Sequence, residues 1–260
     1  MSQYRTQEKF RTEITPIVSN NANFVKGKAG EPELISWGDA VTMFHEFGHA
    51  LHGLNSNINY PTLAGTYVKR DFVEFPSQLN ERWLLTPELL NQFALHHQTG
   101  KPIPADLVDK IQKARNFDQG FSTVEYLAAA IYDMKIHLAS TPDQTIDAGT
   151  FEKQTMAEIG CPSEIVMRHR PPQFGHIFSS DGYSAGYYVY IWADTLTADV
   201  FEAFNEAGGP YDKAVAKRYY ETILSVGNSV PPDEAFRDFR GRDVDTDALM
   251  RERGFPVTKI

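Results

Sequence analysis

The chain has 260 residues, of which 42% are hydrophobic and 12% aromatic, so it can bury a sizeable core as one large domain or two small ones. The mean hydropathy of -0.39, with no apolar run long enough to span a bilayer, is typical of a soluble globular protein and argues against a membrane partner. The formal net charge of -9 argues against nucleic acid as a partner.

Cysteine usage and the first residues bear on the cellular compartment. Cys161 is the only cysteine, so the sequence permits no internal disulfide and no zinc site made of thiolates. Residues 1–11 lack the apolar core of a secretory signal. The single cysteine fits a reducing compartment and predicts a cytoplasmic protein, although a periplasmic protein with few cysteines would look the same.

Residues 14–24 form the strongest candidate for a strand. Pro16 has no backbone N–H and therefore suits an edge strand rather than a central one. An edge strand ahead of a binding helix can pair with an extended peptide by strand addition. A strand that only tethers a preceding segment would show the same pattern. Residues 26–33, with two glycines and Pro32, then predict a loop.

The next predicted element is a helix that begins after Ser36 and ends near Gly53. Ser36 and Asp39 have the spacing of a capping box, in which a hydroxyl and an acidic residue three positions later satisfy free backbone donors. Apolar residues occur on most sides of this segment, so we expect the helix to be buried and to form a rigid platform. These residues are Val41, Met43, Phe44, Phe47, Ala50, Leu51 and Leu54.

This helix contains the pattern His45-Glu46-x-x-His49. Two histidines four positions apart lie one above the other on a helix, so both imidazoles can face one metal ion. Glu46 is turned toward the open side of such an ion, where it can take a proton from water. Two histidines that only pack in a core would give the same sequence pattern. The helical spacing favours a zinc site.

A catalytic zinc ion has three protein ligands as a rule, and Glu74 is the candidate for the third. It follows His45 by 74 − 45 = 29 positions, which leaves room for a loop and the return of a second helix. A surface carboxylate early in a helix, favoured by the helix dipole, is the alternative. Bulky apolar neighbours on both sides of Glu74 argue that it is buried with a partner.

Three segments resemble one known family: His-Glu-Phe-Gly-His at 45–49, Ala-Gly-Thr at 64–66 and Asp-Phe-Val-Glu-Phe-Pro-Ser-Gln at 71–78. They resemble the zinc site of the thimet oligopeptidase and peptidyl-dipeptidase family of zinc metallopeptidases. The resemblance implies one zinc ion per chain. It also implies that His45, His49 and Glu74 are the zinc ligands and that Glu46 is the general base.

The resemblance also bears on domain organisation. Family members are considerably longer than this chain, and the resemblance covers nearly all of the chain but only the family's carboxy-terminal part. It therefore implies that residues 1–260 are one catalytic domain, a fragment of a longer two-part enzyme, with the missing amino-terminal part of that enzyme as a partner.

Helical patterns dominate the rest of the sequence. The predicted helices cover residues 72–85, a segment starting at Thr86, residues 107–138 with a possible break near Gly120, residues 151–159, residues 190–205 and residues 211–226. Thr141, Pro142 and Asp143 are predicted to end the long segment. Three further histidines are not candidate ligands: the first two read as solvated, because no spacing pairs them with a third ligand, and the last reads as a surface or packing side chain. They are His96, His97 and His137.

A second chemical cluster lies in residues 174–190. Tyr183, Tyr187 and Tyr190 follow the i, i+4, i+7 spacing, so in a helix their hydroxyls would share one stripe. Such a stripe is more often packing than catalysis. Here, however, His176 and a loop that contains a glycine directly precede the tyrosines. Imidazole and hydroxyl groups are suitable hydrogen-bond donors to the oxyanion that develops when a zinc peptidase acts.

The same segment resembles the family named above, which has a histidine, a glycine-rich loop and a run of tyrosines facing the zinc ion. The resemblance implies that His176, Tyr183 and Tyr190 donate to the transition state and that Tyr187 contacts the substrate. The loop at 177–182 is longer and less glycine-rich than in the form typical of thimet oligopeptidase.

Two arginines near the carboxyl end complete the candidates. Arg240 and Arg242 could hold a peptide carboxylate, because a guanidinium binds two oxygens at once. Ordinary surface pairing with neighbouring aspartates is the alternative. Those aspartates are Asp238, Asp243 and Asp245.

The patterns together predict a mainly α, zincin-like helical catalytic domain with a small edge-strand region near the N-terminus. The predicted function is zinc-dependent hydrolysis of peptide bonds in short peptides, with release of C-terminal dipeptides. Three alternatives stay open: an internally cleaving oligopeptidase of the same family, a non-catalytic peptide-binding fragment, and a helical structural protein whose histidines only pack.

Overall fold

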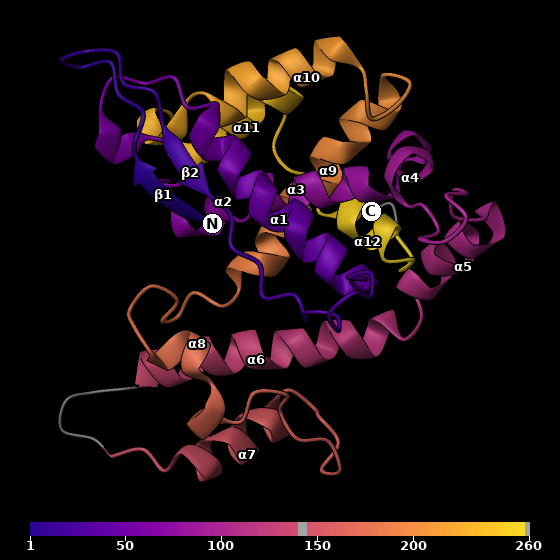
Figure 1. The fold of residues 1–260 in the computed structure, drawn as a ribbon. Coiled ribbons are helices and arrows are strands. Elements are labelled where there is room, and N and C mark those ends of the chain that lie inside the picture. The colour runs from indigo at the N-terminus through magenta and orange to yellow at the C-terminus, as the bar shows by residue number, and fades with distance from the viewer. Residues whose placement is uncertain (140–144, 258–260) are drawn as a thin grey trace. The chain divides into compact units, whose positions relative to one another are not determined.

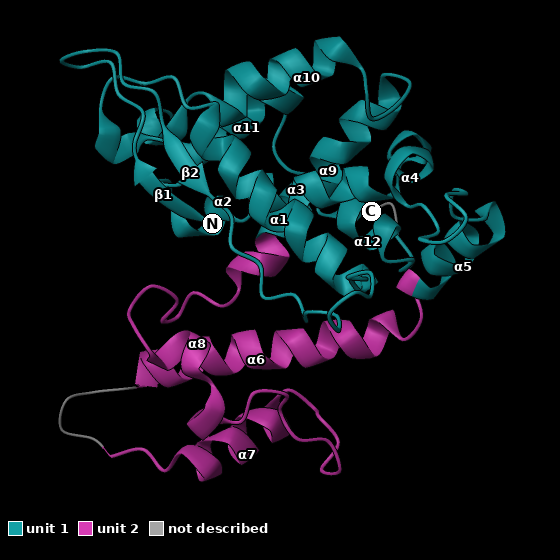
Figure 2. Ribbon diagram, in the orientation of Figure 1, with its two compact units in different colours: residues 1–114, 193–260 teal, residues 115–192 magenta. Residues whose placement is uncertain are grey.

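The computed structural model describes residues 1–139 and 145–257 and confirms the mainly α fold (Figure 1). The chain forms two compact units (Figure 2). Unit 1 joins residues 1–114 to residues 193–260, and unit 2 comprises residues 115–192. The predicted end of a helix at Thr141, Pro142 and Asp143 lies outside the described residues. That residues 1–260 act as one catalytic domain stays a prediction.

Unit 1 consists of helices and one small antiparallel sheet. Its first half contains β1 (Ser2–Arg5), β2 (Ile17–Ser19), α1 (Trp37–Leu54), the 3-10 helix η1 (Pro61–Leu63), α2 (Arg70–Val73), α3 (Phe75–Glu81), the 3-10 helix η2 (Arg82–Leu85), α4 (Pro87–Phe93) and α5 (Ala105–Arg115). Its second half contains α9 (Val189–Glu206), which begins in unit 2, then α10 (Lys213–Tyr219), the π-helix η4 (Tyr220–Leu224), the 3-10 helix η5 (Gly227–Ser229), α11 (Pro232–Arg240) and α12 (Asp247–Glu252).

Unit 2 is built around one long helix. It contains α6 (Gln119–Ala139), α7 (Ala148–Glu158), the 3-10 helix η3 (Pro171–Gln173) and α8 (Gly175–Phe178). The core between these helices includes Tyr132, Ile136, Met156, Phe174 and Ile177. In the part of the chain that the structure describes, no helix is long and apolar enough to cross a membrane.

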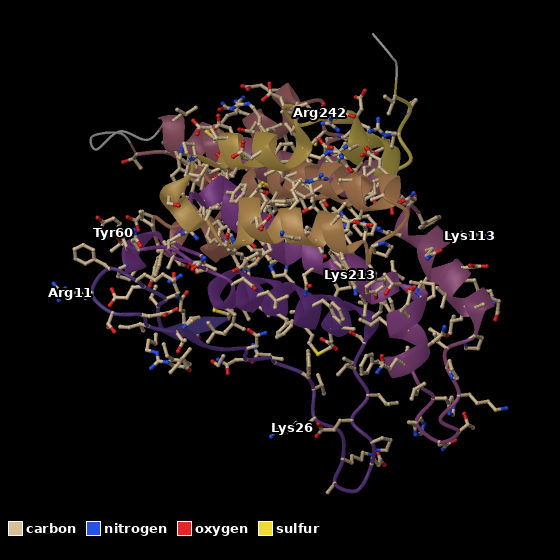
Figure 3. The ribbon with its side chains drawn as sticks, turned by 90° about the horizontal axis from the view of Figure 1, so that it is seen from above. Arg11, Lys26, Tyr60, Lys113, Lys213 and Arg242 are labelled. Atoms are coloured by element: carbon tan, nitrogen blue, oxygen red, sulfur yellow. The ribbon has the colours of Figure 1, made fainter. Side chains whose placement is uncertain are left out.

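The predicted strand at residues 14–24 is confirmed as β2, although it is shorter than expected. β2 pairs with β1, which the sequence analysis missed, in the register Ser2 to Ser19. The segment between β2 and α1 has no regular element, and its side chains are almost all exposed. Figure 3 shows Lys26 on this loop.

The predicted long helix over residues 107–138 is two helices. The chain leaves the helical path after α5 and re-enters it at α6, and Asp118 between them has a positive φ of 52°. A left-handed residue cannot continue a right-handed helix, so it separates the two. The predicted break near Gly120 is therefore confirmed within two residues.

The expectation that α1 is buried on most sides is wrong. Its buried residues include the small residues Gly48, Ala50 and Gly53. By contrast, three large apolar side chains of α1 are 43%, 49% and 45% exposed, namely Met43, Phe47 and Leu54. Close packing through small residues covers only one side of the helix, which the count of apolar letters did not reveal.

The core of unit 1 fixes the position of α3 against α9. Phe75 and Leu79 of α3 belong to one buried cluster with Leu196, Val200 and Phe204 of α9. Helices α10 and α11 add Val215, Phe236 and Phe239 to the same cluster. Phe75 is fully buried, so the helix that follows Glu74 is anchored on its inner side.

Arg240 and Arg242 have structural partners. Both guanidinium groups donate to the fully buried carboxylate of Asp199, with Nε of Arg240 at 2.8 Å and NH1 of Arg242 at 2.6 Å. Arg240 also binds Glu206, and the backbone N–H of Asp245 donates to Asp199 at 2.7 Å. Both arginines therefore form ion pairs, as the alternative predicted. Their main acceptor, however, is a buried residue of α9 and not one of the neighbouring surface aspartates.

Candidate active site

The two histidines of the His-Glu-x-x-His pattern lie in the middle of α1, whose start is fixed as predicted. Ser36 and Asp39 form the capping box: the Asp39 N–H donates to the Ser36 hydroxyl at 3.1 Å, and the Ser36 N–H donates to the Asp39 carboxylate at 3.0 Å. The rings of His45 and His49 lie on one side of this helix with their centroids 4.9 Å apart. The helical spacing therefore places both imidazoles as predicted.

Glu74 occupies the corner between α2 and α3. Its backbone ends one helix and starts the next, with φ of -82° and ψ of -14°. Pro76 follows in the first turn of α3, where its missing N–H costs no helical hydrogen bond. The Ser77 hydroxyl donates to the Glu74 carbonyl at 2.8 Å. Glu74 is only 4% exposed, so it is a buried carboxylate rather than a surface one.

Gly48, between the two histidines, allows α3 to approach α1. A Cβ atom at this position would lie 2.6 Å from the Ser77 Cα and 2.9 Å from the Asn80 Cβ, closer than side chains pack. Asn80 also donates from its side chain to the Phe44 carbonyl at 2.7 Å. The glycine of the pattern therefore brings the helix that carries Glu74 close to the imidazoles.

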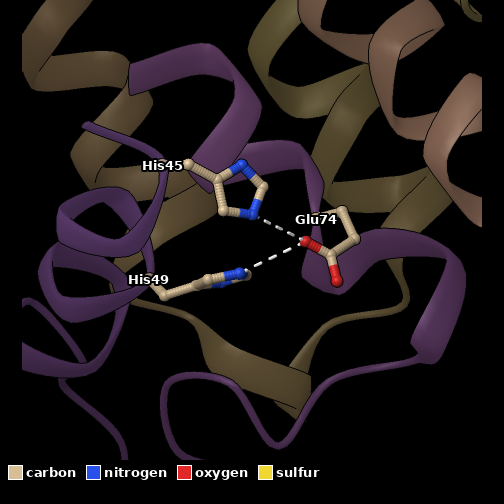
Figure 4. A group of neighbouring side chains, drawn as sticks. All are labelled: His45, His49 and Glu74. Carbon is tan, nitrogen blue, oxygen red and sulfur yellow. Dashed lines mark ion pairs between the residues drawn. The ribbon is translucent and has the colours of Figure 1, made fainter. Parts of the chain in front are cut away.

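His45, His49 and Glu74, which we call the metal-ligand cluster, converge on one point (Figure 4). Nε2 of each imidazole lies 3.2 Å from the same carboxylate oxygen of Glu74. In a tetrahedral zinc site with bonds of about 2.0–2.1 Å, two ligand atoms are about 3.4 Å apart. The donor set of two nitrogens and one oxygen, at nearly this spacing, fits a zinc ion after a small expansion.

Glu81 holds the other side of His45. Its carboxylate lies 2.7 Å from Nδ1 of His45, so Nε2 is the nitrogen left for a metal. Burial of the imidazole lowers its pKa, but the hydrogen bonds to Glu74 and Glu81 outweigh this effect and raise the pKa of His45 to about 9. Without a metal ion, the imidazole of His45 is therefore protonated at neutral pH, and a metal ion that binds there must displace this proton.

A third histidine of α1, His52, is not part of the cluster. It is fully buried, and neither ring nitrogen has a hydrogen-bond partner among the described residues. Burial, with a smaller contribution from His49, lowers the pKa of His52 to about 3. The ring is therefore a neutral core side chain.

Glu46 follows His45 on α1, and its side chain is 29% exposed. Its carboxylate forms an ion pair with the terminal amino group of Met1. The side chain is thus only partly buried. The role of Glu46 as general base stays a prediction.

His176, Tyr183, Tyr187 and Tyr190, which we call the aromatic cluster, come together in unit 2. The ring centroids of His176 and Tyr183 are 4.5 Å apart, and those of Tyr183 and Tyr190 are 5.8 Å apart with nearly parallel planes. Nε2 of His176 lies 3.0 Å from the Tyr190 hydroxyl. The predicted grouping of these four side chains is therefore confirmed.

The predicted cause of that grouping is wrong. Only Tyr190 lies in a helix, because α9 starts at Val189. Tyr183 and Tyr187 lie in turns, and the Gly186 N–H donates to the Tyr183 carbonyl at 2.9 Å. A tight turn, rather than a helical stripe, brings the tyrosines together.

Tyr187 packs against further aromatic rings outside the aromatic cluster. Its ring contacts Phe174 with a centroid distance of 4.9 Å and stacks on Tyr126 at 5.2 Å. Burial raises the pKa of the Tyr187 hydroxyl. The assignment of Tyr187 as a substrate contact stays a prediction, as do the catalytic roles of His176, Tyr183 and Tyr190.

Two residues escaped the sequence analysis. Glu81 follows Glu74 by seven positions, a spacing that places both on one face of a helix, and this was the available signal. Asp133 of α6 is 1% exposed and accepts hydrogen bonds from the backbone of the tyrosine turn. Nothing local in the sequence distinguishes Asp133 from any other helical aspartate.

Comparison with known proteins gives consistent results. The profile described as "Peptidase family M3" matches residues 1–255. Dipeptidyl carboxypeptidase from Escherichia coli (strain K12) is 40% identical over 243 residues, which is 93% of this chain and 35% of the relative. Oligopeptidase A from the same organism is 36% identical over 245 residues, covering 92% of this chain and 35% of the relative.

More distant relatives show the same coverage. The thimet-like oligopeptidase of Dictyostelium discoideum is 30% identical over 241 residues, covering 92% of this chain and 35% of the relative. The chain thus spans about a third of the length of the curated relatives that it matches.

Proposed function

Because this chain belongs to peptidase family M3, we propose that it carries the catalytic site of a zinc-dependent peptidase that hydrolyses short peptides. The rest of the relatives' length is proposed to supply a partner segment, which would form one wall of the substrate channel. The whole protein's activity is part of this proposal, since the chain covers 35% of its relatives.

One observation carries the proposal: two imidazole nitrogens and one carboxylate oxygen, from two separate elements, meet at 3.2 Å. Three protein ligands of this type are the usual set of a catalytic zinc site, which keeps one position open. A purely structural zinc site closes all four positions with protein ligands. The cluster therefore supports a catalytic site more than a structural one.

The chain's own residues divide the work as follows. A bound zinc ion would supply a Lewis acid that activates water and polarises the peptide carbonyl. Glu46 takes the proton of the attacking water and passes it to the leaving amine. Glu81 keeps Nδ1 of His45 engaged and thereby orients its ring. Tyr183, Tyr190 and His176 donate hydrogen bonds to the oxyanion.

The proposed products are C-terminal dipeptides. This choice is supported by the 40% identity to a protein named dipeptidyl carboxypeptidase, against 36% to one named oligopeptidase A. The difference is small, so internal cleavage by the same site is the second candidate. Tyr187 is proposed to contact the peptide in both cases. The compartment predicted from the sequence stays a prediction.

The test combines metal content with product identification. The purified chain, after dialysis, should contain close to one zinc ion per chain by elemental analysis. It should cleave a hexapeptide whose products are identified by mass spectrometry, and a chelator should abolish cleavage that added zinc restores. Zinc without cleavage would identify a non-catalytic peptide-binding fragment, whereas a chain without zinc would support the helical structural protein.

A further inference from the structure

The turn that carries the tyrosines is fastened to α6 by a single buried carboxylate. One oxygen of Asp133 accepts a hydrogen bond from the Ala185 N–H at 2.9 Å, and the other accepts from the Tyr187 N–H at 2.8 Å. The Tyr126 hydroxyl, also on α6, donates to the Tyr187 carbonyl. The Asp133 carboxylate and the Tyr126 hydroxyl therefore hold both ends of the segment from residue 185 to residue 187. Nδ1 of His137, on the same helix, also lies 3.3 Å from the Ala185 nitrogen.

This segment is poorly suited to keep its shape without help. Ala185 has a φ of 52°. This angle lies in the left-handed region, which is unfavourable for a residue that carries a Cβ atom. The chain folds back tightly at Gly186, where a Cβ would lie 3.3 Å from the backbone of Tyr183. A strained conformation persists only where the surroundings impose it. Here the Asp133 carboxylate is such a constraint.

The shape of the turn sets the arrangement of the aromatic cluster. Tyr183 begins the turn and Tyr190 follows it, yet their rings stack with an interplanar angle of 10°. Tyr190 also reaches His176, whose Nε2 lies 3.0 Å from its hydroxyl. A change in the turn would therefore move these groups relative to one another, even though Asp133 contacts none of their side chains in the hydrogen bonds described.

We propose that Asp133 is a positioning residue that holds the 183–187 turn and thereby aligns Tyr183, Tyr190 and His176 for the hydrolysis proposed above. This inference rests on the proposed function for its catalytic consequence. Asp133 acts through backbone N–H groups and does not touch the substrate. A carboxylate is suited to this task because each oxygen accepts a strong hydrogen bond while the group stays buried.

His137 supports the carboxylate from the next turn of α6. Its Nδ1 lies 2.8 Å from the same oxygen of Asp133 that accepts from Ala185, and 2.9 Å from the Asp133 carbonyl. Its ring packs against Phe178 of α8 with a centroid distance of 5.5 Å. The histidine read from the sequence as a surface or packing side chain therefore belongs to the support of the turn.

The variant that tests the proposal is Asp133→Asn. The amide keeps the shape of the side chain but replaces one acceptor oxygen with an NH2 group, which would face a backbone N–H. Glu152→Gln is the matched control, because Glu152 is 3% exposed in the same unit and pairs with Arg170 at 2.8 Å. Both variants remove a buried charge, and only the first touches the turn.

Two measurements separate positioning from general destabilisation. Hydrogen exchange at the Ala185 and Tyr187 amides should become at least about tenfold faster in Asp133→Asn and stay unchanged in Glu152→Gln. The ring-nitrogen NMR signals of His176, assigned with His176→Gln, should shift in the first variant only. With a peptide substrate, kcat should fall about 10- to 100-fold in Asp133→Asn, with a smaller change in KM.

Equal effects of the two variants on exchange and on the His176 signals would overturn the proposal, as would an unchanged kcat in Asp133→Asn together with a loosened turn. A wild-type chain that cleaves no peptide would instead contradict the proposed function. In that case the exchange and NMR comparisons still decide whether Asp133 positions the turn.

Discussion

The metal-ligand cluster and the aromatic cluster reach their geometry by different means. His45 and His49 are fixed by the repeat of one helix, and Glu74 is brought to them by close contact of two helices at Gly48. The aromatic cluster depends on a turn that a buried carboxylate holds from another helix. The proposed metal ligands thus lie on or next to packed helices, whereas two of the proposed substrate-facing tyrosines lie in a turn that contains a left-handed residue.

This difference suggests how each cluster can fail. Loss of a ligand or of the helix contact should change metal binding and activity together. Changes in the aromatic cluster should reduce turnover while the metal stays bound. The variants below test this division, starting with the largest expected effect.

Glu46→Gln and Glu74→Ala should separate chemistry from metal binding. Gln keeps the size of the side chain at position 46 but cannot take a proton, so turnover should fall by about 10²- to 10⁴-fold with zinc still bound. Glu74→Ala should lose both zinc and activity, because it removes a ligand. Zinc content and kcat on one peptide substrate measure the two effects. Full activity of Glu46→Gln would remove the proposed base.

Tyr190→Phe should lower kcat by about 10²-fold and change KM little, because its hydroxyl is proposed to donate only in the transition state. Zinc content should equal that of the wild type. Tyr220→Phe, in unit 1 and 39% exposed, is the control and should leave both constants unchanged. If KM rose and kcat/KM fell by the same factor while kcat stayed constant, the Tyr190 hydroxyl would be a ground-state contact.

Glu81→Gln should weaken zinc binding about 10- to 100-fold, because the ring of His45 would lose the carboxylate that orients it. Activity at saturating zinc should recover most of the wild-type value. Competition with a chromophoric chelator gives the affinity. Unchanged affinity would mean that the contact between Glu81 and His45 has no role in metal binding.

Gly48→Ala should destabilise the protein by about 1–3 kcal/mol and weaken zinc binding, because α3 must move away from α1. Gly38→Ala on the same helix is the control: its Cβ would meet only the Ser36 hydroxyl at 3.7 Å. That change should be neutral or stabilising by at most about 1 kcal/mol. Urea unfolding and zinc titration of both variants measure the difference. Equal results would show that the close helix contact is unimportant.

The last prediction concerns pH in the metal-free protein. Since the pKa of His45 rises from 6.5 to about 9 on folding, its protonation stabilises the folded state fully below pH 6.5, and this contribution is lost as the pH rises through about 9. Zinc affinity should rise over the same range, because binding releases the proton. Urea unfolding after chelation, from pH 6 to 9.5, tests the sign. The contribution of His45 is read as the difference in unfolding free energy between the wild type and Glu81→Gln. A difference that increases from pH 6 to 9.5 would contradict the raised pKa of His45.

Much of the fold and the metal site could be predicted from local patterns. The capping box at Ser36 and the spacing of His45 and His49 depend on neighbours within a few residues, and the structure places them as expected. The resemblance to a known family supported the choice of Glu74, which lies far from the histidines in sequence. Local geometry is repeated along a helix, so a short pattern is enough to define it.

Tertiary structure decided the remainder. The exposure of Met43 and Phe47 and the pairing of Arg242 with Asp199 depend on which elements cover which. The turn at Ala185 replaced a helix that the tyrosine spacing had suggested, because Asp133, 52 positions earlier, supplies its hydrogen bonds. Such long-range contacts leave no periodic trace in the sequence. The sequence therefore determined which side chains are candidates for metal binding and for hydrogen-bond donation, and tertiary packing determined how those side chains are held.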